Sequence, residues 1–358
     1  MNNVPAMAVF RGRVASGLLD VTDDPEALDS EGFWAVVAEF EGRLTFARFS
    51  SVRPLVPAAQ SGVWQGPGPY QWSSSLSHAS YVAGVQRIRD FIAAGDVYQA
   101  NLCRILSAPI GPGADIKSLA ALLAARHHAP YAAMVRLPDH GIEVASASPE
   151  LFIRRDDQVI HSGPIKGTGC TEDDLLEKDY AENVMIVDLV RNDLGRICET
   201  GSVTVPSLCA VEKHPGLVHL VSGVRGVLGK DIGWGQMLAA AFPPGSVTGA
   251  PKQRALDIIR SLETAPRGPY CGGIGWVDAD RRCGELAVGI RTFWIDREQS
   301  RLRFGTGAGI TWGSDPEREW DETELKAARL VSIASNGGLL GADDQDRSIP
   351  DLVVPPAK

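Results

Sequence analysis

Apolar residues recur at helical spacing in several stretches of the chain. The clearest stretch predicts a helix from Ser80, in position to cap it, to Gly95, with one apolar face formed by Tyr81, Val85, Ile88 and Ile92. The same period predicts helices over residues 116–128, 177–198 and 316–336, and another that begins near residue 251.

Runs of apolar and β-branched residues predict strands between these helices. Phe33–Phe40 and Leu44–Phe49 flank Glu41-Gly42-Arg43, which is a hairpin signal. Further strand-like runs lie at 96–106, 132–137, 142–147, 218–228, 272–277, 286–295 and 302–306. Because strands and helices do not alternate one by one, the pattern excludes a doubly wound parallel sheet and predicts an α+β fold with large antiparallel sheets.

Two stretches lack these patterns. Residues 58–77 are rich in Ser, Gly, Pro and Gln, which predicts a long surface connection. Residues 337–358 are typical of a disordered tail. We therefore expect a single fold in which residues 1–78 supply N-terminal strands and a linker, and residues 79–336 form the main domain.

Composition narrows the class of protein. The 358 residues are 44% hydrophobic and 22% charged, as in ordinary globular proteins, and the net charge of −9 argues against a nucleic-acid partner. No apolar run is long enough to span a bilayer and residues 1–17 lack a signal-peptide core, so we expect no membrane association and a cytoplasmic location. The six cysteines are widely scattered, which favours reduced thiols over disulfides or a zinc site.

Several polar, glycine-rich segments suggest a site for a small anion. Gly307-Ala308-Gly309 would let backbone N–H groups approach an anion, because glycine has no Cβ. Glu319 and Glu322 are three positions apart on a predicted helix and share a face, as do Asp179 and Glu182. Two such faces opposed across a cavity would offer the oxygen ligands that Mg²⁺ prefers.

Plainer interpretations compete for each of these residues taken singly. Lys166, within Gly-Pro-Ile-Lys-Gly-Thr, could be a desolvated nucleophile, but a lone lysine is more often a surface residue. A Glu-x-x-Glu helix face is usually solvated and salt-bridged. His219 alone is more often a packed or surface histidine than a catalytic group.

Together, and in this order, the segments resemble the chorismate-utilising enzymes, which include anthranilate, aminodeoxychorismate, isochorismate and salicylate synthases. The resemblance runs from about Tyr81 to Ser335. It rests on Ser148-Pro149-Glu150, Pro164-Ile165-Lys166-Gly167-Thr168, Ala181-Glu182-Asn183, residues 187–194 (VDLVRNDL), Thr248-Gly249-Ala250-Pro251-Lys252, Ile290-Arg291-Thr292 and residues 307–310 (GAGI). It implies two packed antiparallel β-sheets flanked by helices, with an active site in a cleft between them.

The resemblance also implies that the chain binds chorismate and Mg²⁺. Carried over motif by motif, Glu182 and Glu322 are the expected metal ligands, with Asp179 and Glu319 as water-mediated or alternate ligands. The expected substrate-binding residues are Tyr270, Arg291, Gly307, Gly309, Lys326, Thr168 and Ser246.

The expected catalytic residues follow from the same motifs. Glu150 resembles the general acid that helps the C4 hydroxyl of chorismate to leave, and His219 the histidine that lines the ring pocket. Lys166 resembles a lysine that attacks C2, after which ammonia adds at C4 and expels it. The product would be 4-amino-4-deoxychorismate, the precursor of p-aminobenzoate and folate.

Two positions favour this aminodeoxychorismate synthase component I activity over its alternatives. Isochorismate and salicylate synthases place a lysine that activates water where this chain has Gln99, and an amide cannot act as that base. Anthranilate synthases usually carry alanine at the position of Lys166. Anthranilate synthase component I and a non-catalytic chorismate-binding regulator remain alternatives.

The resemblance implies a partner as well as a substrate. It occupies nearly all of the chain, so ammonia is expected from a separate glutamine amidotransferase subunit. Gly163 and Gly169 stand close to positions where relatives often carry arginine, which changes the electrostatics of the loop around Lys166.

Overall fold

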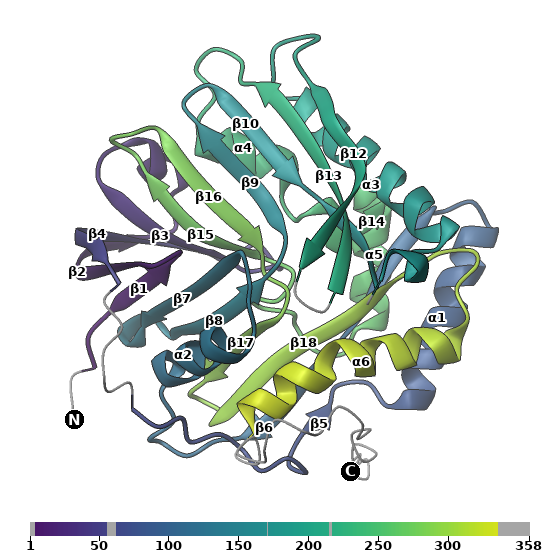
Figure 1. Ribbon diagram of the computed structural model, residues 1–358, viewed down its shortest axis with the longest axis horizontal. Coiled ribbons are helices and arrows are strands. Elements are labelled where there is room, and N and C mark those ends of the chain that lie inside the picture. The colour runs from purple at the N-terminus through teal and green to yellow at the C-terminus, as the bar shows by residue number, and fades with distance from the viewer. Residues whose placement is uncertain (1–3, 56–61, 170, 215–216, 336–358) are drawn as a thin grey trace.

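Six helices surround a large antiparallel sheet in the part of the chain that this computed structural model describes, residues 4–55, 62–169, 171–214 and 217–335 (Figure 1). The helices are α1 (His78–Ala93), α2 (Ile116–Arg126), α3 (Glu177–Gly195), α4 (Trp234–Ala241), α5 (Lys252–Leu262) and α6 (Pro316–Ala334). The pattern of apolar positions predicts all of them except α4.

The main strands form one continuous series in which every pairing is antiparallel. The order is β12 (Thr204–His214), β13 (Leu217–Val227), β10 (Val159–Gly163), β9 (Leu151–Asp156), β16 (Cys283–Val288), β15 (Gly273–Asp278), β3 (Phe33–Ala38), β4 (Leu44–Pro54), β2 (Arg13–Thr22), β1 (Met7–Phe10), β7 (Tyr131–Leu137), β8 (Ile142–Ser148), β17 (Thr292–Asp296), β18 (Arg301–Ile310) and β6 (Gln99–Pro109). β11 (Ile165–Gly169) follows β10 along β13, whereas β5 (Ser73–Ser74) and β14 (Gly249–Ala250) pair with β6. The predicted α+β class is confirmed.

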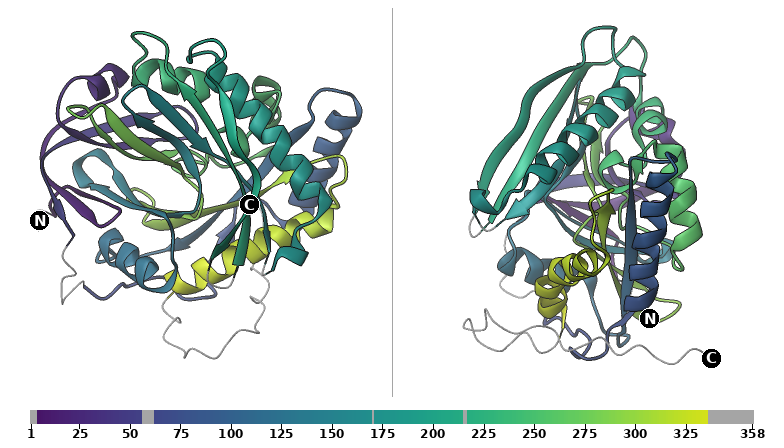
Figure 2. Two further views of the ribbon diagram at one scale, coloured as in Figure 1. Left: turned by 45° about the horizontal axis from the view of Figure 1, so that its top comes forward. Right: turned by 90° about the vertical axis from the view of Figure 1, so that its right-hand side faces the viewer.

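Strand β1 joins the two halves of this series. It pairs with β2 on one side and with β7 on the other. Residues from distant strands nevertheless share one buried core, since Trp34 of β3 and Phe152 of β9 pack in the same cluster as Cys103 and Ile105 of β6. The series therefore folds over itself, and its two halves enclose the main core (Figure 2).

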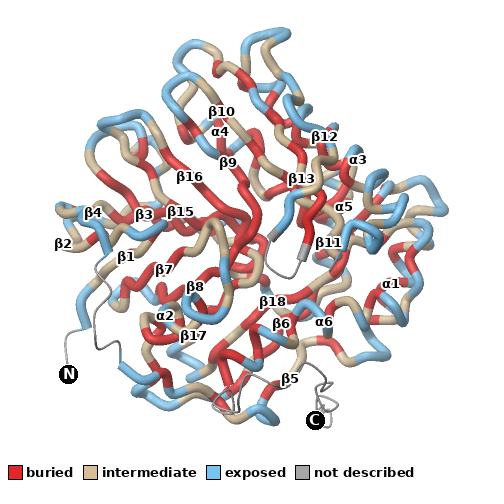
Figure 3. The backbone as a smooth tube through the Cα atoms, in the orientation of Figure 1, coloured by how far each residue is buried: buried red, intermediate tan, exposed pale blue. Residues whose placement is uncertain are grey.

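The helices pack against the sheet. α3, α4 and α5 contribute Ile186, Met237 and Ile259 to the main core. α2 and α6 pack on each other and on β8 and β18 respectively, and α1 packs against α6 and β6. Burial is concentrated along the strands and the inner helix faces (Figure 3).

Helix α1 begins earlier than the sequence pattern predicts. Its N-cap is Ser77, whose side chain accepts a 3.1 Å hydrogen bond from the backbone N–H of Ser80. The assignment of Ser80 as the cap is therefore wrong. Ser77 has the extended backbone that a capping residue requires, whereas Ser80 already lies within the first turn.

The connection before α1 is anchored in the protein rather than lying on its surface. Trp64 and Trp72 are buried, and their indole N–H groups donate to the Ala334 carbonyl at 2.7 Å and to the Ser335 hydroxyl at 3.0 Å. The prediction of a surface connection is wrong for this part of residues 58–77. Most of its residues are polar, but its two tryptophans anchor it to the end of α6.

The remaining features concern membranes and thiols. None of the described helices combines the length and the apolar character that a bilayer crossing requires. The five cysteines in the described ranges are free thiols: Cys103, Cys198, Cys209, Cys271 and Cys283. Cys170 and the predicted tail, residues 337–358, lie outside those ranges.

Candidate active site

Glu150 lies in the tight connection between β8 and β9. The Ser148 hydroxyl fixes this connection, because it donates to the Val288 carbonyl at 2.6 Å and accepts from the Glu150 N–H at 3.2 Å. Burial raises the pKa of the Glu150 carboxyl to about 7, although a hydrogen bond from Ser246 and the charge of Lys166 favour the ionised form. Glu150 can therefore hold a proton near neutral pH and release it.

Lys166 lies on β11, a strand that packs against α3. Its positive charge favours the ionised forms of Glu150, Glu182 and Glu322. The structure thus brings the predicted nucleophile together with the predicted acid and both predicted metal ligands.

Glu182 of α3 and Glu322 of α6 face each other across this site. Burial raises the pKa of Glu182, and the negative charges of Asp179 and Glu322 raise it further. Burial also acts to raise the pKa of Glu322, but the charges of Lys326, Lys178 and Lys166 together outweigh it and the net shift is downward; Lys326 forms a 2.6 Å ion pair with Glu322. Lys326 also donates to the Gly307 carbonyl at 3.2 Å.

The two further predicted metal residues differ in their surroundings. Glu319 is buried, which raises the pKa of its carboxyl, and the nearby charge of Glu322 adds to this shift. Asp179 instead caps its own helix, since one of its oxygens accepts from the Leu176 N–H at 2.8 Å. Asp179 therefore has one carboxylate oxygen already engaged.

The donor set suits Mg²⁺ held by few protein ligands. In the described ranges no three His, Cys, Asp or Glu side chains converge as a ready metal cage. The negative charge of Glu322 nevertheless raises the pKa of Glu182, and a divalent cation between the two carboxylates would relieve this repulsion. Mg²⁺ commonly binds through one or two carboxylates, with water and substrate oxygens completing its shell.

Arg291 lies just before β17, on the other side of Glu150. Its backbone has a φ of 54°, a left-handed conformation that is costly for a residue with a side chain and is found most often at functional sites. Burial lowers the pKa of its guanidinium, the charge of Arg329 lowers it further, and Glu150 opposes the shift. A buried guanidinium beside one carboxyl group can bind a carboxylate of a ligand.

His219 and Thr168 lie opposite each other on paired strands. Their Cα atoms are partners in the β11–β13 register, so His219, which is buried, stands two residues along from Lys166 across the pair. The structure therefore brings His219 to the predicted site. The side chain of Thr168 is outside the described set.

Tyr270 and the two glycines of β18 belong to the packed core beside the site. The Tyr270 ring lies against Gly305, and its hydroxyl neighbours are Cys103 and Cys271; burial raises its pKa well above the ordinary value. A Cβ on Gly307 would lie 2.5 Å from the Cys103 sulfur, so side-chain packing alone requires glycine there. A Cβ on Gly309 would lie 2.2 Å from the Gln99 amide nitrogen. The pairing of Tyr270 with Arg291 on a ligand stays a prediction.

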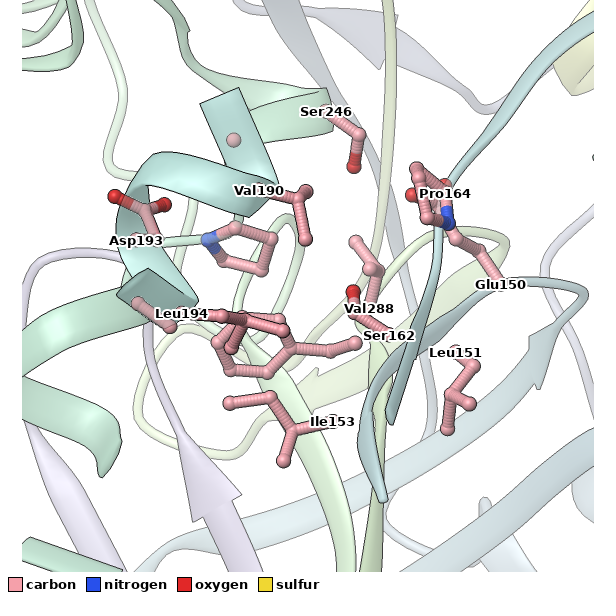
Figure 4. A pocket seen from close by; sticks show the side chains of 14 residues that line it. Glu150, Leu151, Ile153, Ser162, Pro164, Val190, Asp193, Leu194, Ser246 and Val288 are labelled. Carbon is pink, nitrogen blue, oxygen red and sulfur yellow. The ribbon is translucent and has the colours of Figure 1, made fainter. Parts of the chain in front are cut away.

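A small cavity extends behind Glu150 (Figure 4). Its volume is about 20 Å³, which is room for about one water molecule. Glu150 and Asp193 lie on opposite sides of it, and Ser162 and Ser246 supply hydroxyl groups to its wall. Glu150 therefore borders a small space whose wall is mostly apolar.

An ion pair joins two residues of the sequence motifs for which the sequence predicts no individual role. Lys252, at the start of α5, donates to the Asp193 carboxylate at 2.6 Å and to the Ala241 carbonyl at 2.8 Å. Lys252 lies in the Thr-Gly-Ala-Pro-Lys segment and Asp193 in Arg-Asn-Asp-Leu, so their place in these motifs is the signal that the sequence offers. The pair joins α3, α4 and α5 behind the site.

Comparison with known proteins places this geometry in a family. The family described as chorismate binding enzyme matches residues 47–332. The chain belongs to the chorismate-binding enzyme family. Family membership agrees with the resemblance seen in the sequence motifs.

Relatives in the chorismate-binding family carry two different names. The chain is 40% identical over 275 residues to an anthranilate synthase component 1 of Haloarcula marismortui, covering 73% of this chain and 54% of that protein. It is 39% identical over 272 residues to the aminodeoxychorismate synthase component 1 of Klebsiella aerogenes, covering 73% and 59%. The chain thus spans a little over half the length of these relatives.

Solved structures of chorismate-binding enzymes share the fold. Anthranilate synthase component I of Streptococcus pneumoniae superposes with a TM-score of 0.74 at 23% identity, covering 92% of this chain and 93% of that one. The menaquinone-specific isochorismate synthase of Escherichia coli gives 0.75 at 18% identity, covering 92% and 89%.

Proposed function

We propose that the protein is the chorismate-binding component of an aminodeoxychorismate synthase, which replaces the C4 hydroxyl of chorismate with an amino group. The observation that carries this proposal is the position of Lys166, whose charge acts on Glu150, Glu182 and Glu322 together. A lysine that pointed into bulk solvent would not act on three carboxyl groups from different elements, of which Glu150 is buried and Glu182 and Glu322 are partly buried. Relatives named aminodeoxychorismate synthase component 1 support the same activity.

The proposed reaction has two substitution steps. The free amine of Lys166 forms a bond to C2, the ring double bonds shift, and the C4–O bond breaks as Glu150 donates its proton to form water. Ammonia then bonds to C4, the double bonds shift back, and the C2–N bond to Lys166 breaks. The new ammonium group returns one proton to the Glu150 carboxylate, which restores the acid. Lys166 leaves as it entered, so the net change is chorismate plus ammonia to 4-amino-4-deoxychorismate plus water.

The other residues would bind and orient the substrate. The Arg291 guanidinium would hold one carboxylate of chorismate, and His219 would line the pocket of the ring. Glu182 and Glu322, with Glu319 and Asp179 nearby, would hold Mg²⁺, which supplies positive charge for the second carboxylate. Lys326 would keep Glu322 ionised through their ion pair.

A glutamine amidotransferase partner belongs to this proposal. The relatives at 36–39% identity are named component 1, which supports an assembly with a second component. We propose that the partner supplies ammonia by hydrolysing glutamine, and that free ammonium at high concentration can replace it.

The test is to identify the product. The purified chain is incubated with chorismate, Mg²⁺ and ammonium, and we expect 4-amino-4-deoxychorismate by mass spectrometry without release of pyruvate. Anthranilate with pyruvate would instead establish the second candidate activity, which the 40% identity to an anthranilate synthase component 1 favours. Binding without consumption of chorismate would indicate a regulator and overturn both.

The role of Lys166 has its own test. Lys166→Ala should lower the rate of amination at least about a hundredfold, because no other amine replaces the nucleophile. Lys230→Ala removes an exposed lysine and serves as the matched control, with an unchanged rate. Wild-type turnover by Lys166→Ala would eliminate attack by this lysine.

A further inference from the structure

His127 contacts the guanidinium of Arg291. It directly follows the last residue of α2, and its Nε2 lies 3.4 Å from Nη1 of Arg291. A guanidinium only donates hydrogen bonds, so Nε2 must accept. The imidazole is therefore neutral and carries its proton on Nδ1 when this contact is made.

The surroundings of His127 keep it in this state. Burial lowers the pKa of its ring to about 4, and the charges of Arg291, Arg329 and His128 lower it further. At neutral pH the imidazole is thus an uncharged acceptor that adds no repulsion to Arg291. A protonated histidine at this place would lose the hydrogen bond and repel the guanidinium.

Arg329 holds the end of α2 where His127 can contact Arg291. It projects from α6 and donates to the carbonyl of Arg126, the last residue of α2, at 2.9 Å. Its charge also lowers the pKa values of both Arg291 and His127, so the three side chains form one local group. α6 therefore holds the end of α2, and with it His127, beside Arg291.

The group has an excess of positive charge. Within the described ranges, neither Arg291, which is partly buried, nor Arg329, which is exposed, has a carboxylate within 4.0 Å, whereas each of the fully buried arginines there has one: Arg104, Arg136, Arg155 and Arg267. Among the described residues, Glu150 is the one negative group that shifts the pKa of Arg291, and burial raises the pKa of its own carboxyl to about 7. Two guanidinium groups without a partner carboxylate are suited to an anionic ligand.

We infer that His127 is a positioning residue for substrate binding: it accepts a hydrogen bond from Arg291 and holds the guanidinium in the orientation that grips a carboxylate of the substrate. The inference rests on the proposed function for the identity of the substrate. It adds to that function a residue that no sequence motif contains. One N–H group of the Arg291 guanidinium donates to His127. Because this hydrogen bond fixes the orientation of the guanidinium, its remaining N–H groups point in a fixed direction.

Matched substitutions test this role. His127→Gln places an amide oxygen near the position of Nε2, whereas His127→Asn is equally polar but too short to reach Arg291. We expect His127→Asn to raise the KM for chorismate about tenfold, the loss of one hydrogen bond to a charged group, with kcat changed less than twofold. His127→Gln should stay within about threefold of the wild-type KM. His128→Asn, at the exposed neighbouring histidine, should leave KM unchanged.

A double-mutant cycle separates positioning from a structural role. In an Arg291→Lys background, which lacks the fork, His127→Asn should have no further effect on KM. Equal KM values for wild type and His127→Asn would overturn the inference. So would equal defects in His127→Asn and His127→Gln, or additive effects in the cycle.

The comparison of variants does not depend on which product the enzyme forms. KM is followed through chorismate consumption, so anthranilate formation would overturn the proposed function and leave the comparison of variants valid. The Kd of chorismate, measured by calorimetry with Mg²⁺ and without ammonium, should rank the variants in the same order. A different ranking would overturn the inference.

Discussion

At the scale of single residues, the acid role proposed for Glu150 and the stability of the fold make opposite demands. Its carboxyl must be buried to hold a proton near neutral pH, and the same burial makes its ionisation costly to the fold. The pKa of about 7 in the folded protein lies above the ordinary 4.5. Stability is therefore unaffected below about pH 4.5 and declines as the pH rises through 7.

Replacing this carboxyl group should stabilise the protein at alkaline pH. Glu150→Gln removes the cost of burying a charge, and we expect it to increase the free energy of unfolding by about 3 kcal/mol at pH 8. The increase should vanish near pH 4, where the wild-type carboxyl is protonated in both the folded and the unfolded protein. Denaturant unfolding at the two pH values measures it, with the exposed Glu298→Gln as control. A gain of the same size at both pH values would show that ionisation is not its source.

Some residues of the candidate site can be predicted from the sequence and others cannot. Glu150, Lys166, Glu182 and Glu322 lie in contiguous motifs, so a sequence alone identifies them and the structure brings them together. His127 belongs to no motif. It reaches Arg291 only because α2 packs against α6, a tertiary contact that leaves no local pattern.

At the scale of elements, the approach of β11 to α3 places Lys166 beside the carboxylates. Gly167 permits this approach, because its φ is 83° and a Cβ there would lie 2.9 Å from the Cβ of Asp179. The strand that carries Lys166, the proposed nucleophile, and the helix that carries Glu182 thus touch at a glycine.

Filling this contact should disturb both stability and activity. We expect Gly167→Ala to cost at least about 1–2 kcal/mol of folding free energy from the left-handed backbone alone, and to lower chorismate turnover by displacing Lys166. Gly195→Ala is the control, since a Cβ at that position of α3 has nothing within 4 Å. Thermal unfolding and turnover of both variants make the comparison. Wild-type behaviour of Gly167→Ala would show that β11 has room to move.

Element boundaries show why periodicity is an incomplete guide. The apolar face of α1 is clear in the sequence, but its cap depends on the backbone of Ser77 rather than on residue type alone, since Ser80 is also a serine. α4 has the sequence WGQMLAAA and packs five buried residues into the core. A helix of eight residues that is apolar on nearly every side has no polar face to reveal its period.

At the scale of the whole molecule, the segment before α1 fastens one edge of the sheet to the end of α6. Trp72 is buried, stacks edge-on against Phe293 and donates to Ser335. Trp64 makes a similar hydrogen bond, from its indole N–H to the Ala334 carbonyl. α6 carries Glu319, Glu322 and Arg329, so this fastening helps to position the site.

Removing this anchor should weaken the entire fold. Trp72→Ala should reduce the free energy of unfolding by about 3–5 kcal/mol, as expected for a large buried aromatic side chain. Trp312→Ala is the control: Trp312 is 62% exposed, and the change should stay within about 0.5 kcal/mol. Equilibrium denaturation curves report both values, and a loss of less than 1 kcal/mol for Trp72→Ala would mean that the segment is only loosely attached.

The pairing of β3 with β15 has a consequence during translation. A ribosome releases β3 and its neighbour β4 early, yet the opposite edge of β3 pairs with residues 273–278, which emerge only after most of the chain. All six residues of β3 (FWAVVA) are buried in the finished protein. Until β15 arrives, the nascent polypeptide presents an open apolar edge that invites pairing with other chains, so its yield in the cell should depend on chaperones that shield this edge.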